Sequence, residues 1–161
     1  MEGLPKNEFE KLGVIVSRVV DLACQLPEAT DRHGAYFCLA DGDTGLPKLL
    51  MLVGSVSVIK APKYLQFAQE KARRLSLHED HRTSRESRDP EKDQYGGAVY
   101  VNGDIFSLSG LPERLDEAVV IVVASLVGDL SEKEIRVRAG MHTDDPNPFF
   151  DSFIKLHARF S

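Results

Sequence analysis

The sequence lacks the features that mark membrane-spanning, secreted and nucleic-acid-binding proteins. No apolar run approaches the roughly 18 residues that suggest a membrane span. The acidic stretch Met1–Lys11 contains no apolar core of a signal peptide. The chain has 20 Lys and Arg against 25 Asp and Glu, and its net charge of −5 disfavours phosphate backbones and anionic membranes as partners. We therefore expect a cytoplasmic protein that binds neither nucleic acid nor a membrane.

Cysteine is scarce, and the common motifs of catalysis and nucleotide binding are missing. Cys24 and Cys38 both lie in apolar patterns, so we expect two reduced, buried side chains and no disulfide. The chain contains no P-loop, no G-x-G-x-x-G fingerprint and no G-x-S-x-G nucleophile elbow. These motifs therefore identify no catalytic residue, and whether the protein is an enzyme stays open.

The residues that are present predict a single α+β domain. With 161 residues, 42% of them hydrophobic, the chain is long enough to bury one substantial core. Apolar spacings of three and four predict helices at 7–26 and 62–77. Short apolar or alternating runs predict strands at 35–39, 47–56, 98–101 and 104–109, and Asn102-Gly103 is a strong hairpin signal. Two hairpins with helices packed on them make a mainly antiparallel sheet.

The segment from His78 to Gln94 is charged and almost free of apolar side chains. It reads HEDHRTSRESRDPEKDQ and follows the second predicted helix directly. Such a segment has little to bury, so we interpret it as the exposed helix end followed by a mobile loop outside the core.

Residues 113–127 fit two structures. The run AVVIVVASLV has strand propensity, but a helical stripe, Pro112 at the start and Gly128 at the end favour a helix. That helix is apolar nearly all round, so it must be buried on two sides, by the sheet and by a neighbouring element or subunit. For this reason we expect a homo-oligomer, at least a dimer.

The C-terminal part of the chain predicts two more helices. Ser131 with Glu134 forms a capping-box pattern, which indicates a short helix after Gly128. A terminal amphipathic helix at 149–160 carries an apolar stripe of Phe149, Phe153, Leu156 and Phe160. This apolar area is large for a free tail, so we expect residues 130–161 to form a helical extension docked on the domain.

One stretch has a specific pattern of glycines, strands and a helix start. Gly96-Gly97 leads into AVYVNGDIFSL, followed by Ser109-Gly110, Pro112 and Asp116 at the start of an apolar helix. Together with the element order, this pattern resembles the heme-degrading-domain family, which includes GlcG-like and HbpS-like proteins and the C-terminal domain of PduO-type proteins. The resemblance covers about residues 7–128 and implies a domain of this kind at 1–129.

The chain also departs from that family pattern. Glu117 stands where the most similar subgroup often has His, and no Pro follows the glycine pair. Phe106 and Leu108 make the returning strand bulkier than the glycine-rich strand of the wider family. These changes remove one imidazole and narrow any groove beside that strand.

Two functional hypotheses follow. The resemblance implies a protein that binds heme, a related tetrapyrrole or another small ligand, or an enzyme that degrades heme. The alternative is a non-enzymatic, self-associating module without a cofactor, in which helix 113–127 and the Phe-rich terminal helix form the subunit contacts. A hemin titration distinguishes the two.

Candidate ligand-binding residues lie in the charged segment and next to it. His78 and His81 are spaced i, i+3, and a solvated helix end explains this spacing better than a metal site does, so we predict no metal. If heme binds, elimination of the other candidates leaves His78 or His81 as the iron ligand. Lys71, Arg74 or Arg82 would then pair with the propionates.

The glycine pattern supplies the remaining candidates. Gly96 and Gly97 allow a close approach of the backbone that a Cβ would prevent. Ser109 and Gly110 form a strand-to-helix corner whose free N–H groups, at a helix start, suit an anion such as a carboxylate. The alternative interpretation is that Ser109 caps the helix and Gly110 only permits the corner.

Overall fold

The computed structural model describes residues 5–160, and it confirms the α+β class. Its four strands form one open antiparallel sheet in the order β2-β1-β4-β3. The strands are β1 (Gly34–Asp41), β2 (Pro47–Gly54), β3 (Ala98–Val101) and β4 (Asp104–Ser109). The two predicted hairpins are therefore present, and β1 pairs with β4 to join them. The first four residues of the acidic stretch Met1–Lys11 lie outside the described residues.

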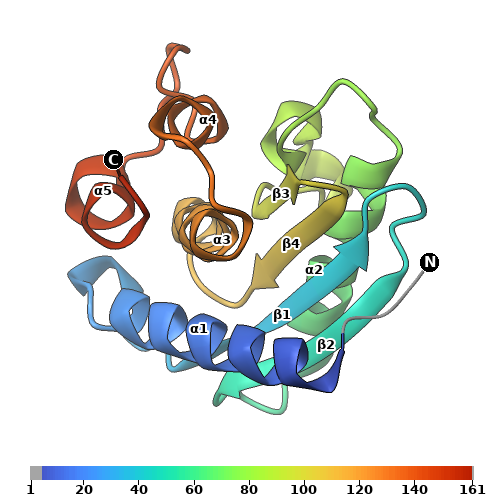
Figure 1. The fold of residues 1–161 in the computed structure, drawn as a ribbon. Coiled ribbons are helices and arrows are strands. Elements are labelled where there is room, and N and C mark those ends of the chain that lie inside the picture. The colour runs from blue at the N-terminus through green and yellow to red at the C-terminus, as the bar shows by residue number, and fades with distance from the viewer. Residues whose placement is uncertain (1–4, 161) are drawn as a thin grey trace.

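Helices cover both faces of the sheet (Figure 1). Helices α1 (Lys6–Cys24) and α3 (Glu113–Gly128) lie on one face, and α2 (Ala61–Ser76) lies on the other. Alternation along the strands assigns the side chains to these layers: Phe37 and Leu39 face α1 and α3, whereas Cys38 and Ala40 face α2. The turn at Asn102-Gly103 has positive φ at both residues, as a two-residue hairpin requires.

Residues 113–127 are helical, and their apolar surface is covered within the chain. Val119, Val120, Val122 and Val123 are all fully buried among the sheet, α1 and the C-terminal residues. The second layer that the sequence requires is thus supplied by the extension, which lies on the side of α3 away from the sheet (Figure 1). A second subunit is not needed to bury α3, so the reasoning that led to an oligomer was wrong. The oligomeric state itself stays a prediction.

The C-terminal extension docks, although its last helix differs from the expected one. Helix α4 (Glu132–Arg138) starts with the predicted Ser131–Glu134 capping box. The terminal segment is a π-helical turn, η4 (Phe150–Ile154), followed by one α-turn, α5 (Lys155–His157). Phe150 and Phe153 are buried, but Leu156 is 68% exposed. The wider π-turn shifts the stripe, so the predicted apolar face is only partly right.

The charged segment 78–94 is built into the fold, which corrects its interpretation as a loop outside the core. It contains two 3₁₀ turns, η2 (Ser84–Ser87) and η3 (Pro90–Lys92), and Ser84 is fully buried. Thr83 pairs with Val99, and the Ser84 hydroxyl accepts a hydrogen bond from the Ala98 N–H at 3.0 Å. The segment thereby continues the sheet beyond β3. Its polar side chains fold against the protein because they satisfy buried backbone groups.

Two other expectations concern cysteine and the membrane. Cys24 and Cys38 are both free, but only Cys38 is buried as expected, since Cys24 is half-buried. Burial raises the pKa of the Cys38 thiol to about 12. A thiol of this kind is unreactive at neutral pH. Among residues 5–160, no helix has the length and apolar character needed to cross a membrane.

Candidate functional site

A buried ion pair between Lys71 and Asp116 lies next to Gly97 and the corner at 109–112. Lys71 extends from α2 through the sheet layer, and its Nζ donates to the Leu108 carbonyl at 2.7 Å and to Asp116 Oδ2 at 3.3 Å. Asp116, on the first turn of α3, accepts a further hydrogen bond from the Leu111 N–H at 3.0 Å. Buried ionised groups are tolerated only when such partners are present. The pair therefore ties α2, β4 and α3 together at one point.

Two of the predicted glycines are required by this geometry. Gly97 has φ +123°, and a Cβ there would lie 2.6 Å from Lys71 Nζ. Gly110 has φ +148°, and a Cβ there would lie 2.7 Å from the Ala35 Cα. Of the predicted site residues, Ser109 and Gly110 line the pocket beside the Lys71–Asp116 pair, Gly97 packs against Lys71, and Gly96 lies instead against Glu113 and Glu117.

The strand-to-helix corner holds an anion that belongs to the protein itself. The Asp116 carboxylate accepts a hydrogen bond from the Leu111 N–H. The sequence pattern predicts instead that the N–H groups of this corner bind an external carboxylate. The alternative interpretation is not met either, because the N-cap of α3 is Pro112 and no side chain caps the helix. Gly110 does permit the corner. Ser109 lines the pocket beside it.

Burial raises the pKa of Asp116 to about 7, against the opposing charge of Lys71 and the hydrogen bond from Leu111. Loss of hydration is the larger effect because the carboxyl is completely enclosed. A carboxyl with a pKa near neutrality exchanges its proton in the physiological range. Groups of this kind gather at functional sites, so the pair is a candidate for one.

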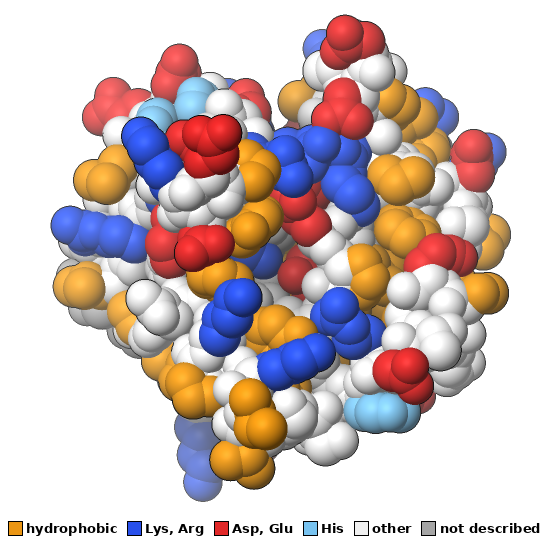
Figure 2. Space-filling model, turned by 180° about the vertical axis from the view of Figure 1, so that it is seen from behind, with side chains coloured by type: hydrophobic (Ala, Val, Ile, Leu, Met, Phe, Trp, Pro, Cys, Tyr) orange, Lys and Arg blue, Asp and Glu red, His pale blue; other side chains and the backbone are white. Residues whose placement is uncertain are grey.

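A second candidate site is an arginine-lined pocket of about 290 Å³. It lies between η2, α3, α4 and the loop that contains Thr143 and Asp145, and its apolar floor includes Val99, Ile121 and Val137. Figure 2 shows basic side chains gathered around a hollow on this face of the molecule, with acidic side chains among them. Four arginines reach it: Arg82, Arg85, Arg114 and Arg138.

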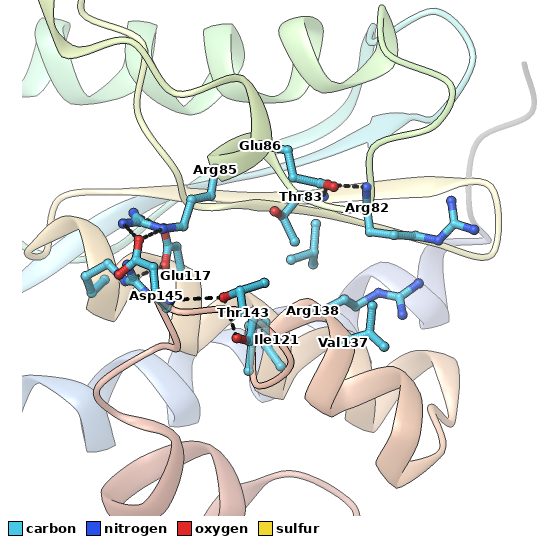
Figure 3. A pocket seen from close by; sticks show the side chains of 14 residues that line it. Arg82, Thr83, Arg85, Glu86, Glu117, Ile121, Val137, Arg138, Thr143 and Asp145 are labelled. Carbon is cyan, nitrogen blue, oxygen red and sulfur yellow. Dashed lines mark hydrogen bonds and ion pairs between the residues drawn. The ribbon is translucent and has the colours of Figure 1, made fainter.

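At one end of the arginine-lined pocket, the arginine charges are paired with carboxylates (Figure 3). Arg85 binds Asp145 and lies 3.1 Å from Glu117 Oε1. Arg114 lies 3.1 Å from Asp145 Oδ1 and 3.0 Å from Glu117 Oε2. Glu117, which stands at the position of the His in the similar family subgroup, is thus committed to two guanidinium groups. Its burial raises the pKa of the Glu117 carboxyl, while Arg114 and Arg85 act to lower it.

At the other end of the arginine-lined pocket, Arg82 and Arg138 have no carboxylate in ion-pair contact among the described residues, and the Glu86 carboxylate there accepts from the Arg82 and Thr83 N–H groups (Figure 3). The guanidinium of Arg138 donates to the Tyr100 carbonyl at 2.9 and 3.1 Å and to the Glu134 carbonyl, but within residues 5–160 it has no carboxylate in ion-pair contact. The Arg82 side chain likewise forms no ion pair or hydrogen bond with any described residue. Burial lowers the pKa of Arg138, and the neighbouring charge of Arg82 adds to this effect against that of Glu134.

The two predicted histidines lie together at the border of a largely polar cavity. Their rings stack at a centroid distance of 4.5 Å and an interplanar angle of 2°, and His78 Nδ1 is 2.9 Å from the Arg74 carbonyl. They border a cavity of about 530 Å³ whose other walls, apart from Leu75, are largely polar, including Asp43 and Arg82. Parallel imidazoles side by side, with few apolar walls, fit a porphyrin poorly. Within residues 5–160, no three His, Cys, Asp or Glu side chains gather as metal ligands do.

Two of the three cations proposed for heme propionates are already used inside the protein. Arg74 is 6% exposed, and its guanidinium binds Glu70, the Ser84 and Tyr95 carbonyls and the Ser87 hydroxyl. Lys71 is engaged with Leu108 and Asp116. Of these three cations, only Arg82 has a side chain without a partner among the described residues. Arg74 is therefore a structural residue that anchors the charged segment to α2.

Sequence reasoning missed the members of the arginine-lined pocket other than Arg82. Arg85, Arg114, Arg138 and Asp145 come from four separate parts of the chain. No spacing rule links them. The only signal was the arginine content of the segment 78–94, which was interpreted as solvated.

Comparison with protein-family models, curated proteins and solved structures found no match to this chain. The resemblance to heme-degrading domains accordingly stays a prediction, and the function is argued from the site.

Proposed function

We propose that the protein binds a small organic anion, with a carboxylate or phosphate group and an aliphatic body, in the arginine-lined pocket. The observation that carries this proposal is the pair Arg82 and Arg138, two cations without a carboxylate partner in the described structure, at the end of a pocket with an apolar floor. Guanidinium groups form strong, bidentate hydrogen bonds to carboxylates and phosphates. The valine and isoleucine floor then favours an aliphatic rather than a fully polar ligand.

Electrostatics supports the same ligand class. Two like charges close to each other repel, and burial removes solvent from one of them. An anion placed between the guanidinium groups relieves both effects. The volume of about 290 Å³ lies just below the usual range of ligand pockets, which is about 300–1,000 Å³, so the ligand is small.

Calorimetric titration with hexanoate tests the proposal, with hexanol as the neutral control. We expect saturable binding of hexanoate that weakens as salt is added, and at least tenfold weaker binding of hexanol. Arg82→Gln is the informative variant, because its exposed side chain supports no other described residue and its loss should leave the fold intact. The matched control is Arg159→Gln, which removes a surface ion pair with Asp129 on another element.

The expected result is a loss of about tenfold or more in hexanoate affinity for Arg82→Gln and no change for Arg159→Gln. One such charged hydrogen bond is worth about 1.5–3 kcal/mol. Equal binding of hexanoate and hexanol, or an unchanged affinity of Arg82→Gln, contradicts the proposal.

A second candidate function is self-association, favoured by the exposed edge of the sheet. Strand β2 pairs only with β1, and Leu50 and Leu52 on it remain 39% and 47% exposed because α2 covers the other strands. Val58 and Ile59, which follow β2, are also exposed. An open apolar edge can pair with the same edge of a second copy around a two-fold axis.

Light scattering at micromolar concentration tests self-association. We expect a dimer for the native chain and a monomer for Leu52→Lys, while Val14→Lys, on the exposed face of α1, keeps the native mass. A native monomer rules out this candidate and the oligomer predicted from the sequence.

A further inference from the structure

A pocket lies next to the Lys71–Asp116 pair, separate from the arginine-lined pocket. Its volume is about 190 Å³, and it is lined by Lys71 and Asp116, by the corner 109–112 and by three aromatic side chains, Tyr64, Phe67 and Tyr95. Phe67 and Tyr95 meet edge to face at 5.6 Å between centroids. Asp116 and Glu117 are consecutive residues of α3, yet they line the two different pockets.

The floor of this aromatic pocket contains an unused hydrogen-bond donor. Lys71 carries three N–H groups as an ammonium. Two have acceptors, the Leu108 carbonyl and Asp116, and the third has none among the residues that the structure describes. The Lys71 side chain is only 3% exposed, so bulk water has little access to the third N–H. A donor buried without an acceptor is costly, and a ligand oxygen in the pocket would satisfy it.

The rim of the aromatic pocket contributes a cation. Arg32 donates to the Gly110 carbonyl at 2.6 Å and lies 3.5 Å from the Tyr64 hydroxyl. Over the described part of the chain it makes no ion pair. It also borders a neighbouring cavity of about 350 Å³ whose charged lining consists of Asp31, Arg32 and Lys60. Two carboxyl groups also line the aromatic pocket: Asp116 is committed to Lys71 and Leu111, and Glu113 is committed to Arg88 and the Gly96 N–H.

We propose that the aromatic pocket is a second ligand site, which binds a planar aromatic carboxylate. The ring lies against Tyr64, Phe67 and Tyr95, because aromatic side chains favour edge-to-face and offset contacts with a flat ligand. The carboxylate lies between Arg32 at the rim and the third N–H of Lys71 at the floor. The arginine-lined pocket has an aliphatic floor, so its ligand differs in chemistry. The two proposed sites are therefore independent of each other.

The volume agrees with a ligand of one ring. About 190 Å³ admits a benzoate-sized molecule, and the adjoining cavity beyond Arg32 leaves room for a polar substituent. The glycine signature is then explained by the site that it encloses. Gly97 brings the backbone against Lys71 without a side chain, and Gly110 turns the chain so that the corner forms a wall.

An NMR titration of the full chain with benzoate tests the inference. We expect saturable shifts of the Tyr64, Phe67 and Tyr95 ring signals and of the Leu111 amide. Benzyl alcohol, which keeps the ring but not the charge, should bind at least tenfold more weakly. Cyclohexanecarboxylate, which keeps the charge but not the flat ring, should shift these signals much less.

Two variants locate the binding. Arg32→Gln should weaken benzoate binding about tenfold, and Phe67→Leu should weaken it severalfold while keeping an apolar side chain at this half-buried position. Arg159→Gln, which removes a surface arginine outside both pockets, is the matched control and should leave benzoate binding unchanged. The amide spectrum of each variant confirms that it is folded.

Several results would overturn the inference: no saturable shift of the three rings, shifts confined to the residues around Arg138, or full affinity in both Arg32→Gln and Phe67→Leu. None of these results bears on the hexanoate titration, which tests the arginine-lined pocket. Either proposal can therefore fail while the other holds.

Discussion

The Lys71 ammonium lies 3.3 Å from the Asp116 carboxylate, and neither side chain is more than 4% exposed. An ion pair removed from water to this extent gains little net stability, since the loss of hydration offsets the attraction. Replacing such pairs with apolar residues is often neutral or stabilising. In this protein the pair forms the meeting point of α2, β4 and α3, and it borders the aromatic pocket. A binding role explains why a costly pair is built there.

The pH dependence of stability should report the titration of Asp116. Its pKa rises from 3.8 to about 7 on folding, so between about pH 4 and pH 7 the folded state holds a proton that the unfolded state has lost. The free energy of unfolding therefore falls as pH rises through this window, by up to about 1.4 kcal/mol per pH unit, and the Asp116 contribution levels off above it.

Asp116→Asn isolates this effect. Urea unfolding of the native chain and of the variant from pH 4 to 8 gives a difference curve in which the other carboxyls cancel. We expect the native chain to lose stability relative to the variant as pH rises to about 7. A flat difference curve would mean that the pKa of Asp116 is not raised.

Gly97→Ala should be more destabilising than Gly103→Ala. Both glycines have positive φ, so each substitution carries a backbone strain of about 1–3 kcal/mol. At Gly103 the new Cβ meets nothing within 4 Å, whereas at Gly97 it also displaces the Lys71 ammonium at 2.6 Å. Urea unfolding should give a larger loss for Gly97→Ala by at least about 1 kcal/mol. Equal losses would show that contact with Lys71 does not constrain this position.

Truncation of one phenylalanine tests whether the C-terminal extension is part of the core. Phe153 is 1% exposed and Leu156, three residues later, is 68% exposed. Phe153→Ala should cost about 3–5 kcal/mol of unfolding free energy, and Leu156→Ala less than about 0.5 kcal/mol. Thermal unfolding measures both. A small effect of Phe153→Ala would mean that the extension detaches in solution.

Hemin binding, predicted from the resemblance, has a direct test in the two stacked histidines. If hemin binds through its iron at the predicted ligands, the His78→Ala, His81→Ala double variant should lose the Soret band of the ligated form, even though the exposed His33 is still present. His142→Ala, an exposed histidine of the extension, is the control. An unchanged spectrum and affinity in the double variant would exclude His78 and His81 as ligands.

Local patterns in the sequence determined most of the secondary structure. The helix at 113–128, the hairpin at Asn102-Gly103 and the Ser131 capping box follow from spacing and from residues that favour particular backbone angles. The strands at 98–101 and 104–109 also followed, because alternation along a strand is a local property. The glycine pattern indicated the corner at 109–112, which lines the aromatic pocket, but it did not reveal the Lys71–Asp116 pair beside it.

Only the tertiary structure decided the environment of the charged residues. Arg74 lies on a helix in a polar stretch, yet it is buried, because the segment 78–94 folds over it and offers carbonyl groups. Arg85 and Asp145 are 60 residues apart and meet only because η2 and the loop after α4 pack on the same side of α3. The spacing of apolar residues follows the period of the helix or strand in which they lie, so it can be read from the sequence. The pairing of charges depends on how distant elements pack, and no local pattern encodes that.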